Sequence, residues 1–107
     1  MTKRQYRTLD EIDEEYYRNH PDEIDSYLTT AFETYAEDGD TGALLSSLRM
    51  IARVKGVTAL ANESDLTRNG IQKALSEKAK PRFETISNIV NAMGYGITLQ
   101  KLKKHVP

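Results

Sequence analysis

Four polar side chains, spaced to share one side of a helix, carry the strongest chemical signal in this 107-residue sequence. They are Arg68, Asn69, Gln72 and Lys73. Arginine, asparagine and glutamine can form paired hydrogen bonds with base edges in the major groove of DNA, and lysine attracts phosphate oxygens. The segment is therefore predicted to read duplex DNA. The alternative is a solvated helix face, which is the usual place for such residues.

The elements that must position these side chains are two short helices, about 59–64 and 68–75, joined by a tight turn. This is the layout of a helix-turn-helix DNA reader, whose second helix enters the major groove. Thr67 stands at the start of the second helix, where its hydroxyl can cap free backbone N–H groups. The apolar side chains predicted to face inward are Leu60, Ala61, Leu66, Ile71 and Leu75. The competing interpretation is an ordinary helical core.

The turn has an unusual residue for this layout. A glycine is usual there because one position favours positive φ, and this chain has Asp65 instead. Aspartate tolerates the left-handed region better than most residues. We therefore expect Asp65 to adopt that conformation at some energetic cost.

Further polar residues extend the predicted DNA-binding surface. Thr67 and Ser76 are candidates for phosphate contacts, and the basic loop after the second helix is predicted to supply salt-sensitive attraction through Lys78, Lys80 and Arg82. Arg68 is predicted to pair with guanine, and Asn69 or Gln72 with adenine. For each basic residue a solvated surface role is the alternative.

The distribution of charged residues along the chain agrees with a DNA-binding surface in its second part. Residues 1–40 hold 4 Lys and Arg against 12 Asp and Glu, whereas residues 41–107 hold 11 against 4. The predicted DNA reader lies in the basic part, which can approach a polyphosphate. The chain has no cysteine and no apolar run of the roughly 20 residues that span a bilayer. We expect one domain in the cytoplasm.

Apolar periodicity predicts three further helices. Residues 22–37 carry one stripe, residues 42–55 follow after an Asp40 or Thr41 cap and end at Gly56, and residues 83–93 follow the basic loop. Alternation over 97–100 predicts a short strand, which needs a partner because a lone strand is unstable. The residues predicted to face inward include Tyr27, Leu44, Leu45, Leu48, Ile51, Ala52, Phe83, Ile86, Ile89, Val90 and Met93.

The acidic end reads as a separate unit. Residues 1–20 are polar and tyrosine-bearing, and are predicted to form a flexible acidic arm that precedes a helical domain over 21–107. His20 with Asp22 and Glu23 is a weak candidate for a metal site, and neither a phosphate-binding glycine loop nor a tuned acid–base pair is visible. We expect no enzymatic activity, no cofactor and no metal.

The order of these pieces resembles the addiction-module antidote family, the HigA-type antitoxins of bacterial and prophage toxin–antitoxin pairs. The resemblance covers roughly residues 22–100. Its most specific segments are Leu-Thr-Arg-Asn-Gly-Ile-Gln-Lys-Ala-Leu-Ser at 66–76 and Pro-Arg-Phe-Glu-Thr-Ile at 81–86. Asp65 departs from the family's usual glycine.

The resemblance implies a fold and a function. The fold would be all-α, a lambda repressor-like DNA-binding bundle of about five helices with a short C-terminal strand. The protein would be a homodimer that neutralises a small basic toxin of the RelE/HigB type, which cleaves messenger RNA on the ribosome. It would also repress its own operon at a palindromic operator.

Two surfaces remain to be assigned to partners. An acidic surface complements a basic toxin, so the toxin contacts are placed at Glu14, Glu15, Tyr16 and Tyr17. The last helix and the strand at 97–100 are predicted to form the dimer surface, unless they only close the monomer core. Two other functions compete with the antitoxin: a prophage-type transcriptional regulator with no toxin partner, and a pure protein-interaction adaptor.

Overall fold

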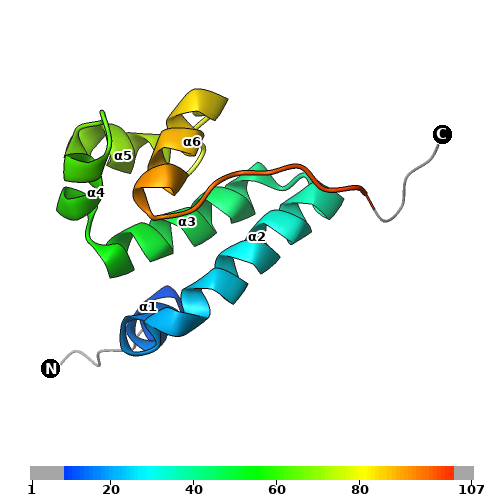
Figure 1. The fold of residues 1–107 in the computed structure, drawn as a ribbon, viewed down its shortest axis with the longest axis horizontal. Helices are drawn as coiled ribbons and strands as arrows, with labels where there is room; N and C mark the ends of the chain where they lie inside the picture. The colour runs from blue at the N-terminus through cyan, green and yellow to red at the C-terminus, as the bar shows by residue number, and fades with distance from the viewer. Residues whose placement is uncertain (1–8, 103–107) are drawn as a thin grey trace, which may run out of the picture.

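The chain folds into helices throughout the part that is described. The computed structural model describes residues 9–102, which form six α-helices and one short 3-10 helix, with no strand among them. The elements are α1 (Leu9–Asn19), η1 (Pro21–Glu23), α2 (Ile24–Asp38), α3 (Thr41–Lys55), α4 (Val57–Glu63), α5 (Arg68–Ala74) and α6 (Phe83–Ala92). In Figure 1, α2 and α3 form a long hairpin, and α4, α5 and α6 gather on the side of α3 away from α2. The predicted all-α class is confirmed.

The hairpin turn and the end of α3 show why the helices stop where they do. Gly39 closes α2 with a left-handed φ of 65°, and its N–H donates to the Tyr35 carbonyl at 2.7 Å. Asp40 then caps α3 by accepting from the Ala43 N–H at 3.0 Å. Gly56 ends α3 with φ 95°. Both positive φ values are favourable for glycine and costly for other residues.

Helix α3 is the centre of the core. Six of its fifteen residues are buried, namely Leu44, Leu45, Leu48, Met50, Ile51 and Ala52. Five of these were predicted from the apolar stripe. Met50 lies off that stripe and is buried because α3 contacts α1, α2 and α4 rather than one neighbour. The other buried side chains are Ile24, Leu28, Leu60, Ile71, Leu75, Ile89, Val90 and Met93.

Two arginines of α3 hold elements that are distant in the sequence. Arg49 donates from Nη1 to the Leu75 carbonyl, which lies at the end of α5. Arg53 donates from Nε to the Glu14 carboxylate in α1 at 2.8 Å. Charge-assisted hydrogen bonds of this kind are stronger than neutral ones. The same helix therefore anchors both the acidic N-terminal part and the predicted reading helix.

The predicted flexible arm differs from what the structure describes. Residues 9–19 of that arm form α1, which packs against α3, and residues 1–8 lie outside the described part. Tyr17 shows why this segment packs as a helix. Its side chain is half-buried, and its ring centroid lies 4.8 Å from that of Tyr27 in α2. The helix is therefore amphipathic: most of its acidic residues face solvent, and an apolar side packs against the rest of the fold. The division of the chain at residue 20 stays a prediction.

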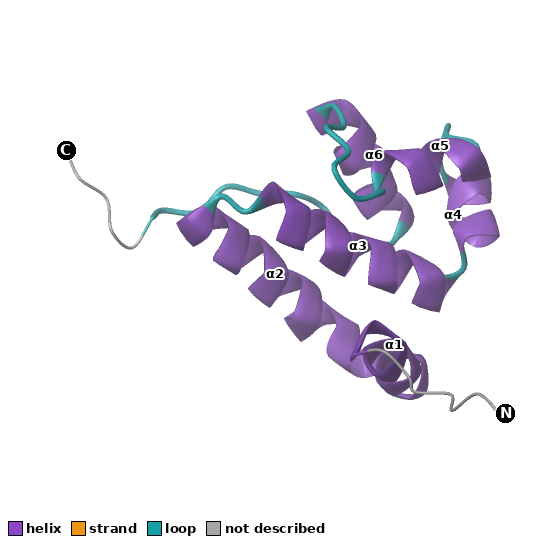
Figure 2. Cartoon of the chain, turned by 180° about the vertical axis from the view of Figure 1, so that it is seen from behind, coloured by secondary structure: helices purple, strands orange, loops and turns teal. Residues whose placement is uncertain are grey.

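The predicted C-terminal strand is not formed. After α6 the chain runs as an extended loop beside the α2–α3 hairpin, drawn in teal in Figure 2. Within residues 9–102, the backbone of 96–102 makes no hydrogen bond to a second extended segment. Alternating apolar and polar residues do not form a strand when no partner strand is present in the described part of the chain.

Two smaller expectations were also wrong. Phe83, predicted to face inward, is 72% exposed because it begins α6 beside an open groove. Asp65 has no positive φ; among the described non-glycine residues only Lys78 does, at 68°. Ser64, which ends α4 with an extended backbone, makes the turn instead, and its hydroxyl accepts from the Leu66 N–H at 3.2 Å.

The Glu14–Arg53 contact predicts how stability depends on pH. The Arg53 hydrogen bond, helped by Arg18 at 2.7 Å, lowers the pKa of Glu14 below its ordinary value of 4.5. A lowered folded-state pKa adds stability above pH 4.5, and that stability is lost as pH falls through the folded-state value. Glu14→Gln should therefore cost about 0.2–1 kcal/mol at pH 7 and less at pH 3.

The measurement is urea unfolding at pH 7 and pH 3, with exposed Glu77→Gln as the matched control. Glu77→Gln should cost the same small amount at both pH values. An equal cost for Glu14→Gln at both pH values would contradict the assigned role of the ion pair.

Candidate nucleic-acid interface

Helices α4 and α5 pack against each other across a four-residue linker. Their contact rests on Leu60 of α4 and on Ile71 and Leu75 at α5, each at most 3% exposed. Thr67 caps α5, because its hydroxyl accepts from the Gly70 N–H at 2.9 Å. The predicted cap is confirmed. A seven-residue helix is marginal alone, so this cap and these buried anchors fix its orientation.

The outward side of α5 carries the predicted base-reading residues. Arg68, Asn69, Gln72 and Lys73 are all exposed, as is Thr67. These five residues form the polar face of α5, and they are brought together by one short helix. No acidic side chain stands among them, so the face offers hydrogen-bond donors and acceptors together with positive charge. Such a set can contact base edges and phosphates.

Arg68 is held in place by a residue that the sequence analysis did not select. Its Nη1 donates to the Thr58 hydroxyl of α4 at 2.7 Å. This bond joins the first turns of α4 and α5 and leaves other N–H groups of the guanidinium for further contacts. The ten-residue separation gives no periodic signal, because Thr58 and Arg68 belong to different helices.

The remaining predicted DNA contacts are spread over a second region. Ser76 is half-buried, and its hydroxyl donates to the Lys73 carbonyl at 2.8 Å. Lys78, Lys80 and Arg82 are exposed in the loop between α5 and α6. Lys78 and Lys80 line a groove toward α2, so the structure does not gather them with the polar face of α5.

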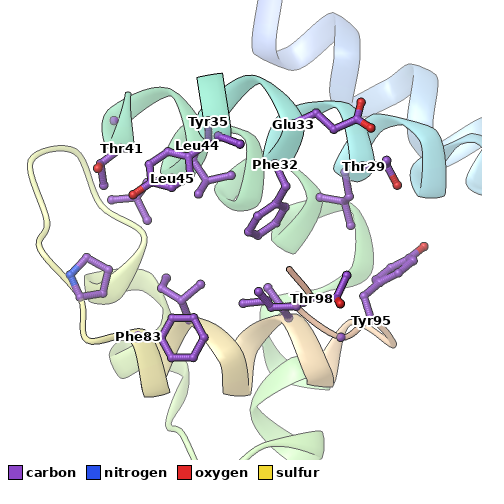
Figure 3. Close-up of a pocket in the computed structure, with 18 of the residues that line it drawn as sticks. Thr29, Phe32, Glu33, Tyr35, Thr41, Leu44, Leu45, Phe83, Tyr95 and Thr98 are labelled. Carbon is purple, nitrogen blue, oxygen red and sulfur yellow. The ribbon is translucent and has the colours of Figure 1, made fainter. Parts of the chain in front are cut away.

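The groove has a volume of about 1140 Å³. Figure 3 shows Phe32 of α2 and Phe83 of α6 on opposite sides of it, with Leu44 and Leu45 of α3 at one end. Tyr95 borders it and donates from its hydroxyl to Asp25 of α2. Burial and that bond raise the pKa of Tyr95 to about 12.

The four residues proposed from the sequence as toxin contacts divide into two pairs. Glu14 is half-buried and bound to Arg18 and Arg53, and Tyr17 is half-buried. Glu15 and Tyr16 are exposed on α1. Tyr16 donates to Glu23 at 2.8 Å, which raises the pKa of its hydroxyl, and its ring stacks on His20.

The described part of the chain, residues 9–102, has neither an assembled metal site nor a membrane-spanning helix. No group of three or more metal-ligating side chains is arranged to hold an ion within this range. Nδ1 of His20 lies 2.8 Å from the Tyr16 carbonyl, which gives that histidine a local hydrogen-bond partner. None of the helices in the described range is long and apolar enough to cross a bilayer.

Comparison with known proteins gives one family and one relative. Residues 8–101 match the profile of a family described as "Probable addiction module antidote protein". The chain is 29% identical over 93 residues to an uncharacterized protein of Haemophilus influenzae (strain ATCC 51907 / DSM 11121 / KW20 / Rd), covering 87% of this chain and 92% of that protein. No solved structure matches the chain.

Proposed function

The chain belongs to the family of probable addiction module antidote proteins, and on that premise we propose that it is an antitoxin that also binds operator DNA. In this proposal the antitoxin acts in the cytoplasm, neutralises a RelE/HigB-type toxin by direct binding, and represses its own operon. The observation that carries DNA binding is the polar face of α5: five exposed polar residues on a helix fixed by Ile71 and Leu75.

The proposed reading mode follows from the order of the two helices. Helix α5 would enter the major groove as the recognition helix of a helix-turn-helix, while α4 crosses the phosphate backbone. Asn69 and Gln72 would read adenine, and Arg68 guanine. One such helix spans only a few base pairs, so a homodimer would place two of them about 34 Å apart on a palindromic operator.

The distribution of charge supports DNA binding by one part of the chain and toxin binding by the other. Residues 41–107, which hold α4 and α5, carry 11 basic and 4 acidic residues, and residues 1–40 carry 4 and 12. The basic part can approach DNA, and the acidic part complements a toxin that must itself bind RNA. Among the proposed toxin contacts, Glu15 and Tyr16 are the two with exposed side chains.

Loss of the reading side chains tests DNA binding. Gln72→Ala and Asn69→Ala should each weaken operator binding by about 1–3 kcal/mol and relax specificity at one base position, because a paired base contact is removed. The measurement is fluorescence anisotropy with the operator and with single-base variants of it. The control is Asn19→Ala at the exposed end of α1. Binding that is unchanged by Gln72→Ala and Asn69→Ala would refute the assignment.

The Thr58–Arg68 bond gives a second test. Thr58→Val removes the hydroxyl at nearly constant volume, so Arg68 is less restrained and operator affinity should fall several-fold, by about 0.5–1.5 kcal/mol. Thr58→Ser keeps the hydroxyl and should retain affinity. The specificity lost in Thr58→Val should be at the base that Arg68→Ala also affects. Equal affinity for Thr58→Val and the wild type would remove Thr58 from the site.

Co-expression tests the toxin. We expect the small protein encoded beside this gene to co-purify with the full chain. Glu15→Lys should reduce that complex by introducing repulsion toward a basic partner, and Asn69→Ala should leave it intact. Operator binding should show the opposite pattern. A chain that binds operator DNA but has no co-purifying partner would indicate a prophage-type regulator instead.

A further inference from the structure

One of the five asparagines in this chain differs from the others in the residue that follows it. Asn69 precedes Gly70, whereas the other four precede residues that carry side chains: Asn19, Asn62, Asn88 and Asn91. The backbone nitrogen of a following residue can attack an asparagine side-chain carbonyl, and glycine has no Cβ to hinder that approach. The sequence therefore hinders this reaction least at Asn69.

The structure places this pair in the first turn of α5, where the backbone nitrogen is held by a side chain. Asn69 is exposed, and the Gly70 N–H donates to the Thr67 hydroxyl at 2.9 Å. The first helical bond of α5 comes one residue later, from the Ile71 N–H to the Thr67 carbonyl at 3.0 Å. First-turn N–H groups depend on such caps because they precede the helical bonds. Loss of one hydroxyl contact therefore frees the attacking nitrogen.

The same cap favours glycine at position 70. A Cβ at Gly70 would lie 3.1 Å from the Thr67 hydroxyl oxygen, which is tighter than an ordinary contact. Glycine also lowers helix stability, and α5 has only seven residues. Its first turn can therefore open without unfolding the rest of the protein. The cap that orients α5 thus leaves a reading asparagine next to the residue that exposes it to attack.

We propose that Asn69 is a site of spontaneous deamidation, and that the product no longer reads DNA. When the first turn opens, the Gly70 nitrogen forms a bond to the side-chain carbonyl carbon of Asn69. The carbon–nitrogen bond of the side-chain amide breaks, and ammonia leaves with the proton that Gly70 carried. Water then opens the resulting cyclic imide at one of its two carbonyls, which gives aspartate or isoaspartate.

Either product changes the polar face of α5. A carboxylate replaces the only donor of the Asn69 side chain and adds negative charge to a face that has no acidic residue. It cannot make the paired contact to adenine, and it repels the phosphates of a duplex. Isoaspartate also lengthens the main chain by one carbon within the first turn. This consequence rests on the proposed function, whereas the chemistry at Asn69 does not.

Peptide-resolved mass spectrometry of the full chain, aged in neutral buffer, tests the site. Asn69 should lose its amide first, with isoaspartate among the products, while the other four asparagines stay intact over the same period. Gly70→Ala should slow the loss several-fold, because its methyl group hinders the nitrogen and the exposed Thr67 can move to admit it. An intact Asn69, or one common rate at all five asparagines, would overturn the inference.

Two cap removals distinguish opening of α5 from unfolding of the whole chain. Thr67→Ala removes the acceptor of the Gly70 N–H and should speed deamidation of Asn69 several-fold. Asp40→Ala is the matched control, because Asp40 caps α3 by accepting from the Ala43 N–H at 3.0 Å. It should leave the rate at Asn69 unchanged, since α5 opens locally. Equal acceleration by both variants would overturn the local route.

Operator binding tests the consequence. Asn69→Asp should bind the operator roughly tenfold or more weakly than the fresh wild type, and the aged chain should lose affinity in step with its modification. Excess operator should slow the modification, because the complex holds the first turn closed.

Two outcomes separate this inference from the proposed function. A chain modified at Asn69 that keeps full operator affinity would overturn the loss of reading, together with the base-reading role of Asn69. Weak operator binding by Asn69→Asp, combined with an Asn69 that stays intact on ageing, would overturn deamidation and leave the proposed function standing.

Discussion

The burial of α3 is the constraint on which the rest of the structure depends. Its apolar residues contact neighbours on several sides, and its polar residues Arg49 and Arg53 bind the end of α5 and the middle of α1. The apolar contacts supply the driving force, since full burial of each large side chain is worth about 1.5–3 kcal/mol. The arginines contribute orientation more than energy. One helix thus fixes the acidic and the basic parts of the chain relative to each other.

This arrangement explains how a very short helix can present a defined surface. Helix α5 has seven residues, too few for stability in isolation. It is held at its start by the Thr67 cap, on its inner side by Ile71, and at its end by Arg49 through the Leu75 carbonyl. Within the polar face of α5, Thr67 caps the helix and Arg68 bonds to Thr58, while Asn69, Gln72 and Lys73 point outward with exposed side chains. A rigid platform with available polar side chains is what base reading requires.

The sequence predicted local features well because their causes are local. Apolar periodicity located the helices from 22 onward, and Thr67, Gly56 and Asp40 acted as the predicted cap and stop residues. The errors involve contacts between distant segments. Three features depend on which neighbouring segment is present: the exposure of Phe83, the helix at 9–19 and the missing strand. The apolar periodicity of a segment does not identify its neighbour. Arg49, Arg53 and Thr58 find partners 26, 39 and 10 residues away, and no spacing rule connects them.

The central claim is that the outward side of α5 is the surface that reads the bases of the duplex. The most direct measurement is an NMR titration of the isotope-labelled full chain with its operator, following backbone and side-chain amides. The account predicts that the largest shifts occur at Asn69, Gln72 and Lys73, including the side-chain amides of the first two. Shifts confined to α1 or to the groove beside α2, with α5 unchanged, would contradict it.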